Sequence, residues 1–395
     1  MPSRHAAHDV APRLMSRSTR IRTSAIPTNT RTRIRVKATE VTMEGLLQNT
    51  WYMAAWESEL EAGKVSRRIA DVPVVVFRNA QGEIGALVDR CPHRFAPLSM
   101  GTVEAGALVC PYHGLGFDTH GKCVVNPFAD KVPAGSAVRA FEVVVRDSIV
   151  WLWFGDADQA DPSLIPDYAF LNGSATNRVI RDYLHLKCHY EYLVDNLMDV
   201  THIEWAHRKT FGGRGLIQHG KHETVQNGNE VWINWSFANV PKQPIPIYHD
   251  AAIPWERTDM WIDTRWNAPA SVLLDIGQTA PGAPREDGLR QLLAHIVTPE
   301  TATTSHYFWG VARQHDVDSV EEDNRIRGML KFAFEMEDVP LVEAAAKVVE
   351  GENFWDLKPV HLGPDIGSTR VRRTLEMLVR KESAAAQAQD RPTPR

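Results

Sequence analysis

Residues 91–113, CPHRFAPLSMGTVEAGALVCPYH, hold two short segments that each contain one cysteine and one histidine. The first provides Cys91 and His93, the second provides Cys110 and His113, and sixteen residues separate His93 from Cys110. An iron–sulfur centre in which two thiolates hold one iron and two imidazoles hold the other needs this donor set from two neighbouring loops. A structural zinc site is the alternative, because zinc also binds Cys and His. The spacing favours the [2Fe–2S] centre.

The residues around these segments have a β pattern. Between Trp51 and about Asp156, short apolar or alternating runs such as 72–78 and 143–154 are separated by turn residues. Together with the two Cys–His segments, this stretch resembles the Rieske domain of the Rieske non-haem iron oxygenases. The resemblance implies a Rieske [2Fe–2S] cluster that receives electrons from a separate ferredoxin-type reductase, which oxidises NAD(P)H.

The predicted fold class is α+β. A small all-β Rieske domain at 43–156 should precede an α+β catalytic domain at 157–383, whose antiparallel sheet encloses the pocket of a mononuclear iron. Residues 384–395 are expected to form a disordered tail. Residues 1–42 contain eight arginines and only two acids, so we expect them to be disordered. They are either a transit peptide or the result of a start codon assigned too early.

Composition excludes several other classes of protein. The net charge of −5, with both signs scattered along the chain, gives no signal for nucleic-acid binding. No apolar run reaches the roughly eighteen residues that a membrane-spanning helix needs, so no membrane partner is predicted. The chain has four cysteines, and two of them belong to the Cys–His segments. A disulfide framework is therefore not expected, and the protein is predicted to be cytoplasmic.

A second motif lies at residues 195–207, DNLMDVTHIEWAH. Iron(II) that activates O2 is typically held by two imidazoles and one carboxylate on one side, with the other positions open, and His202 and His207 are the candidate imidazoles. On a regular α-helix, residues five positions apart point about 140° away from each other. Both rings can reach one metal only if the helix has a π-bulge or ends between them.

This motif closely resembles the iron-site motif of the oxygenase components of vanillate O-demethylase type, in which residues matching Asn196 and Asp199 occur at the same offsets. The resemblance implies that Asp199 accepts hydrogen bonds from an iron-ligating imidazole and from a cluster-ligating imidazole of the neighbouring subunit. Asn196 belongs to the same catalytic group. Transfer between subunits implies a ring, so a homotrimer is expected.

The same resemblance places the carboxylate ligand in residues 332–344, FAFEMEDVPLVEA, and implies that it is Asp338. Glu337 and Asp323 are the competing carboxylates, and a solvated charged helix face is the structural alternative. Pro340 lacks a backbone N–H and is expected to kink the helix just after Asp338, which would aim that side chain inward.

The substrate pocket is less clearly marked. His295, Asn234 and Trp309 are candidates for it, and packing in the core or at a sheet edge is the alternative for each. The resemblance implies oxidative O-demethylation of a methoxylated, vanillate-like aromatic acid by O2, which gives a phenol and formaldehyde. The alternatives are ring hydroxylation or aryl-ether cleavage of a phthalate-, phenoxybenzoate- or sulfonate-type arene, a Rieske electron carrier without catalysis, and a zinc-stapled binding module.

Overall fold

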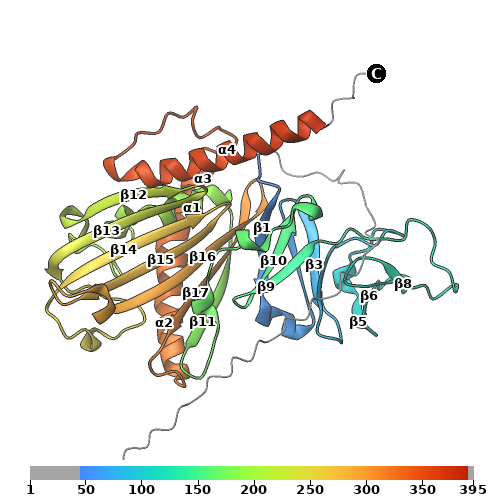
Figure 1. Ribbon diagram of the computed structural model, residues 1–395, viewed down its shortest axis with the longest axis horizontal. Helices are drawn as coiled ribbons and strands as arrows, with labels where there is room; N and C mark the ends of the chain where they lie inside the picture. Colours follow the sequence, from blue (N-terminus) through green and yellow to red (C-terminus); the bar gives the residue numbers. More distant parts are fainter. Residues whose placement is uncertain (1–44, 390–395) are drawn as a thin grey trace, which may run out of the picture. The chain divides into compact units, whose positions relative to one another are not determined.

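The computed structural model describes residues 45–389, and its first half is built from β-strands (Figure 1). Ten antiparallel strands form three small sheets, in the orders β1-β10-β9, β2-β3-β4 and β5-β6-β7-β8. Their bounds are β1 Thr50–Trp56, β2 Lys64–Ile69, β3 Val72–Arg78, β4 Ile84–Val88, β5 Thr102–Glu104, β6 Ala107–Val109, β7 Gly116–Phe117, β8 Cys123–Val125, β9 Glu142–Arg146 and β10 Ile149–Phe154. The two Cys–His segments follow β4 and β6, so both occupy loops.

The second half contains one large antiparallel sheet with helices. Seven strands lie in the order β11-β17-β16-β15-β14-β13-β12. Their bounds are β11 Arg178–Leu186, β12 Lys221–Asn227, β13 Glu230–Pro241, β14 Arg257–Asn267, β15 Ser271–Thr279, β16 Leu289–Thr301 and β17 Thr304–Arg313. The helices are α1 Tyr190–Met198, α2 Val320–Phe332, α3 Val339–Val348 and α4 Ile366–Gln389, and a π-helix, Ala333–Asp338, joins α2 to α3. The predicted α+β class and the large antiparallel sheet are confirmed.

Strand β16 faces two different environments because successive side chains of a strand point to opposite sides of the sheet. Leu293 and His295 point into a pocket that is also lined by residues from α1 and the π-helix. Ala294 and Ile296 point the other way and join a buried cluster with aromatic and aliphatic side chains from β1 and β10. The members from those two strands are Trp51, Met53, Trp56, Ile149, Trp151 and Trp153. The β-rich first half is therefore packed on the outer face of the large sheet.

Hydrogen bonds reinforce this packing. The Thr298 hydroxyl donates to the carbonyl of Met53 at 2.8 Å, and both groups are buried. The backbone N–H of Ala70 donates to the carbonyl of Pro299 at 2.9 Å. These bonds fix how the end of β16 meets the first half of the chain.

The C-terminal helix extends further than the sequence suggested. Residues 384–389, which we expected to be disordered, continue α4 to Gln389. Three consecutive alanines at 384–386 favour helix strongly, and this propensity outweighs the lack of a hydrophobic pattern. The prediction for residues 1–42 falls outside the described residues. Among the described residues, no helix is long and apolar enough to cross a membrane.

His306 links the two halves through a buried imidazole. Its Nε2–H donates to the carbonyl of Arg68 on β2 at 2.8 Å, and its Nδ1 accepts from the hydroxyl of Tyr183 on β11 at 2.8 Å. Only the neutral ring can make both bonds, because the protonated ring has no acceptor nitrogen. Burial lowers the pKa of His306 from 6.5 to about 4.

We expect this histidine to make the protein less stable on mild acidification. Between about pH 6.5 and pH 4 the unfolded chain binds a proton that the folded chain does not, so the free energy of unfolding falls as the pH falls through this window. The melting temperature of wild type should therefore fall more steeply between pH 7 and pH 5 than that of His306→Gln. The variant His219→Gln, at an exposed histidine, serves as the control. Parallel curves for wild type and His306→Gln would contradict the assignment.

Candidate metal centres and pocket

The two Cys–His loops share one backbone design. In each, the cysteine carbonyl accepts a hydrogen bond from the N–H four residues later, from Phe95 to Cys91 and from Gly114 to Cys110, both at 3.0 Å. Both donors have left-handed backbone angles, with φ of 62° at Phe95 and 72° at Gly114. Glycine adopts this conformation without strain, whereas a bulky side chain such as that of Phe95 must be held in it by its surroundings.

The donor atoms of these loops are suited to a mixed-ligand iron–sulfur cluster. Cys91 and Cys110 are each 2% exposed. Burial raises the pKa of the Cys91 thiol, and the neighbouring Cys110 thiol adds to this effect. The His93 and His113 rings lie 4.5 Å apart between centroids, and His93 is exposed while His113 is half-buried. Two buried thiols and two imidazoles at the edge are the donor set that a Rieske cluster needs.

His202 is positioned by the end of helix α1. The helix ends at Met198, and the Asp199 side chain then caps a 3-10 helix, Val200–Glu204, by accepting from the Thr201 N–H at 2.8 Å. The His202 Nδ1–H donates to the carbonyl of Asp199, which leaves Nε2 free for a metal. The 3-10 helix ends before His207, so the prediction that the helix is interrupted between the two histidines is confirmed.

Asp338 is presented by the π-helix. This segment, Ala333–Asp338, places one more residue in a turn than an α-helix does, and it ends at Asp338 itself. Pro340 stands in the first turn of α3, where a missing N–H is tolerated. The expected irregularity is therefore present, but it precedes Asp338 as a π-helix and is not a proline kink after it.

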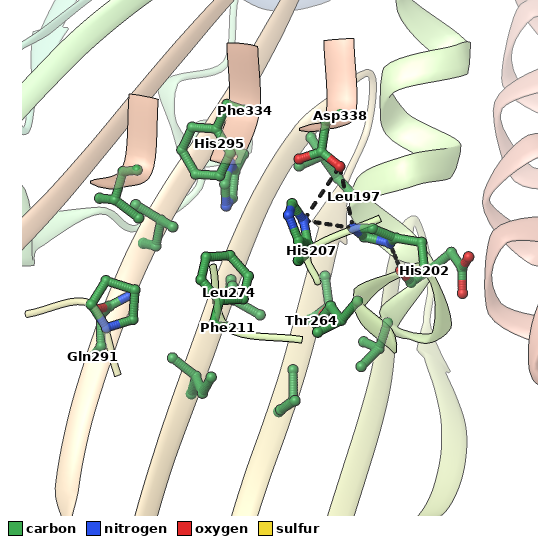
Figure 2. A pocket seen from close by; sticks show the side chains of 18 of the residues that line it. Leu197, His202, His207, Phe211, Thr264, Leu274, Gln291, His295, Phe334 and Asp338 are labelled. Atoms are coloured by element: carbon green, nitrogen blue, oxygen red, sulfur yellow. Dashed lines mark hydrogen bonds and ion pairs between the residues drawn. The ribbon is translucent and has the colours of Figure 1, made fainter. Parts of the chain in front are cut away.

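Three donor atoms converge at this point (Figure 2). The Nε2 atoms of His202 and His207 are 3.2 Å apart, and Asp338 Oδ1 lies 3.5 Å from the first and 3.3 Å from the second. Metal–ligand bonds of about 2.1 Å at right angles place neighbouring donors about 3 Å apart. Two imidazoles and one carboxylate on one side of a metal are the donor set of a mononuclear non-haem iron site, so these residues fit one.

Each donor is oriented by a further group. His207 Nδ1–H donates to Glu337 Oε2 at 3.0 Å, and Glu337 also accepts from the Thr210 hydroxyl at 2.6 Å. The Asn196 side-chain amide donates to Asp338 Oδ1 at 3.2 Å. Burial opposes protonation of His207, but the hydrogen bonds and charges of Asp338 and Glu337 outweigh it and raise its pKa. Glu337 therefore lies behind a candidate ligand and does not point to the donor cluster.

The other competing carboxylate, Asp323, lies elsewhere. It pairs with Arg178 and with Arg313, each at 2.5 Å from a guanidinium nitrogen. Those two guanidiniums outweigh the effect of burial and keep the pKa of Asp323 below its usual value. Asp323 therefore anchors α2 to the sheet and takes no part in the donor cluster.

A largely apolar pocket opens beside the three donors (Figure 2). It encloses about 850 Å³ when its mouth is included. Its wall alternates along the strands, with Ile262 and Thr264 from β14 and Leu274 and Ile276 from β15. One edge is closed by Leu216, whose backbone N–H donates to the Glu204 carboxylate at 2.5 Å. The 3-10 helix that carries His202 thus also holds a wall of the pocket.

The three residues suggested for the substrate pocket lie in different places. His295 lines it, and its Nδ1 is 2.5 Å from the Tyr307 hydroxyl. Burial lowers the pKa of His295 to about 3, so the ring is neutral near pH 7. Trp309 is fully buried behind the pocket against Phe334, with ring centroids 5.5 Å apart, and does not line it. Asn234 is paired with Asp263 and so shares its face, opposite the pocket-facing side chains of β14.

Sequence reasoning missed the polar residues of the pocket wall. Gln291, Thr264 and Gln243 all line the pocket. The first two could have been found, since each is two positions along a strand from another pocket residue. Only the register of β14 to β16 distinguishes the inward-facing set from the outward-facing one.

Comparison with known proteins agrees with this geometry. Residues 50–141 match the family model of the Rieske [2Fe-2S] domain, and residues 186–381 match that of the vanillate O-demethylase oxygenase C-terminal domain. The oxygenase component of chloroacetanilide N-alkylformylase from Rhizorhabdus wittichii (strain DC-6 / KACC 16600) is 36% identical, over 85% of this chain and 96% of the relative. The chain belongs to the Rieske non-haem iron oxygenases.

Two further comparisons support the membership. The oxygenase component of dicamba O-demethylase from Stenotrophomonas maltophilia is 36% identical, over 86% of this chain and 99% of the relative. The crystal structure of dicamba monooxygenase bound to 3,6-dichlorosalicylic acid superposes with a TM-score of 0.79 at 34% identity, and covers 87% of this chain and 100% of that chain.

As a Rieske oxygenase, the chain is the oxygenase component of a monooxygenase. Its cofactors are a Rieske [2Fe–2S] cluster and a mononuclear non-haem iron, and electrons from NADH reach it through a separate reductase. A zinc-stapled binding module and a Rieske electron carrier without catalysis are therefore rejected.

We expect Glu337 to control how tightly iron is held. The variant Glu337→Gln keeps an acceptor for His207 but loses the charge that makes the imidazole a stronger ligand, so the affinity for iron(II) should fall by about 10- to 100-fold. Equilibrium dialysis of the anaerobic protein with iron(II) measures this. Glu335→Gln is a matched control, because Glu335 lies in the same π-helix and pairs with Lys331 at 3.3 Å. Equal losses in both variants would contradict the assignment.

Proposed function

We propose that the chain catalyses oxidative O-demethylation of a methoxylated aromatic compound. The observation that carries the proposal is the apolar pocket beside His202, His207 and Asp338, which we take as the iron ligands. Iron bound there would supply activation of O2. The printed name of one relative, dicamba O-demethylase, describes the same reaction class.

The reaction balances as follows. A methyl C–H bond becomes C–OH with one atom of O2, and two electrons with two protons reduce the other atom to water. The resulting hemiacetal loses its methyl carbon as formaldehyde, and the ring oxygen leaves as a phenol. The apolar side chains around the donors exclude water from this step, and Asn196 holds Asp338 in place.

The proposal divides the chain by role. Residues 43–156 hold the cluster through Cys91, His93, Cys110 and His113 and take electrons from a ferredoxin-type reductase. Residues 157–383 bind the substrate. The described cysteines are all free, which suits the reducing cytoplasm, where we place the protein.

Asp199 is the proposed link between the centres. It lines the pocket, its Oδ1 is used by Thr201, and no described residue is bonded to its Oδ2. We propose that Oδ2 accepts from a cluster-ligating imidazole of a neighbouring subunit in a cyclic homotrimer. The exposed His93 ring is suited to that contact. Light scattering should then give three times the chain mass of 44.4 kDa.

Formaldehyde release tests the reaction. With a surrogate reductase and a panel of methoxylated arenes, the protein should release one formaldehyde for each molecule of substrate consumed. The variant His202→Ala should lose this activity while it keeps the visible absorbance of the cluster. A hydroxylated ring with an intact methoxy group would instead indicate ring hydroxylation.

We expect Asp199→Asn to separate electron transfer from metal binding. Asparagine also caps helices well, so the 3-10 helix and both metals should be retained, whereas turnover should fall by roughly 100-fold or more because the charge between the centres is lost. Metal analysis and O2 uptake measure the two effects. The control Thr201→Val removes the hydroxyl bond to Asp199 but keeps the carboxylate. Turnover near the wild-type rate in Asp199→Asn would remove Asp199 from the electron path.

A further inference from the structure

We propose that the substrate is an uncharged alkylated arene that carries a hydrogen-bond acceptor such as a carbonyl oxygen, and not an aromatic carboxylate or sulfonate. The inference rests on the proposed function, since it concerns the occupant of the same pocket. It departs from the aromatic acid that the family resemblance implies.

The pocket offers no cation to an acidic substrate. Among the described residues that line it, none is lysine or arginine, and the charged ones are Asp199 and Asp338. Glu337 lies directly behind His207. The two positive charges of a bound iron(II) are thus outnumbered by three carboxylates. A substrate carboxylate would enter a site that is already negative.

The remaining basic groups near the pocket are engaged. Arg325 donates to the carbonyl of Pro246, which lines the pocket, at 3.1 Å, but its charge is paired with Glu322 at 2.5 Å. His295 is 3% exposed, and its Nδ1 is engaged with Tyr307. Burial disfavours the charged form of an imidazole. Moving a carboxylate from water into such a site without a partner costs several kcal/mol.

Neutral polar groups in the wall instead await a ligand. Thr264 is fully buried, and its hydroxyl has no partner among the described residues. The Gln291 carbonyl oxygen accepts from the Ile247 N–H at 3.0 Å, and no bond is present from its amide nitrogen to a described residue. An unpaired buried hydroxyl is costly, at about 1 to 3 kcal/mol, so a ligand that accepts from Thr264 is favoured.

The strand register places these groups at the spacing of a small ring. Thr264 is paired with Leu274, which is paired with Leu293, and these three form one row across the sheet. Ile276 and Gln291 belong to the next row, two residues along the strands, which is about 7 Å away. An arene can therefore lie on Leu274 and Ile276 while its polar substituent meets Thr264 or Gln291 (Figure 2).

Two probes that differ in charge test the inference. Calorimetric titration of the iron-loaded, anaerobic full-length protein should show that 3-methoxybenzamide binds at least about tenfold more tightly than 3-methoxybenzoate. The variant Thr264→Val should weaken benzamide binding by up to about tenfold and leave benzoate binding unchanged. Thr258→Val is the matched control, because Thr258 is also a fully buried, unpartnered threonine of β14 but does not line the pocket.

A gain-of-binding variant guards against loss of folding. Leu274→Lys places a cation in the wall and should strengthen benzoate binding by at least about tenfold relative to Leu274→Met. Wild type that binds benzoate as tightly as benzamide, or binds neither, overturns the inference. Benzamide binding without formaldehyde release from any methoxyarene would support the substrate class and reject O-demethylation. Formaldehyde release from acids alone would do the reverse.

Discussion

The site depends on holding three donor atoms within 3.2 to 3.5 Å of one another on segments that are distant in sequence. Such a cluster has a cost, since two imidazoles and a carboxylate are removed from water together. Hydrogen bonds at the far side of each group offset it. The Asp199 carbonyl orients His202, Glu337 orients His207, and Asn196 holds Asp338. Each ring is thereby fixed in the tautomer that leaves Nε2 free to bind a metal.

The large sheet supports the site from one face and the cluster domain from the other. Along β16, Leu293 and His295 line the pocket, while Ala294 and Ile296 pack with the tryptophans of β1 and β10. Both faces are dry, so the strand is buried almost throughout. A change at an outward-facing residue of β16 can therefore shift the pocket by way of the backbone. The same packing fixes how the cluster loops are carried by their own chain.

The sequence predicted the metal donors better than it predicted the pocket. Two Cys–His pairs and two histidines five residues apart are rare patterns with a direct chemical meaning, so they could be recognised without coordinates. Asp338 could be named only by family resemblance, because nothing in its spacing from His207 shows that the two meet. Asn234 and Trp309 show the limit most clearly. A polar or aromatic residue in a strand gives no sign of which face it occupies until the register is known, and the first lies on the outer face and the second in the core behind the pocket.

The π-helix at Ala333–Asp338 makes the length of this segment as important as its composition. A π turn holds one residue more than an α turn, so removing any single residue there would let the helix become regular. Everything after the deletion would rotate by about 100° relative to α2. A neighbouring side chain, and not a carboxylate, would then face the two imidazoles. Single-codon deletions in this stretch should consequently be far more damaging than most substitutions at its exposed position, Met336, and natural length variation is expected to be confined to loops outside it.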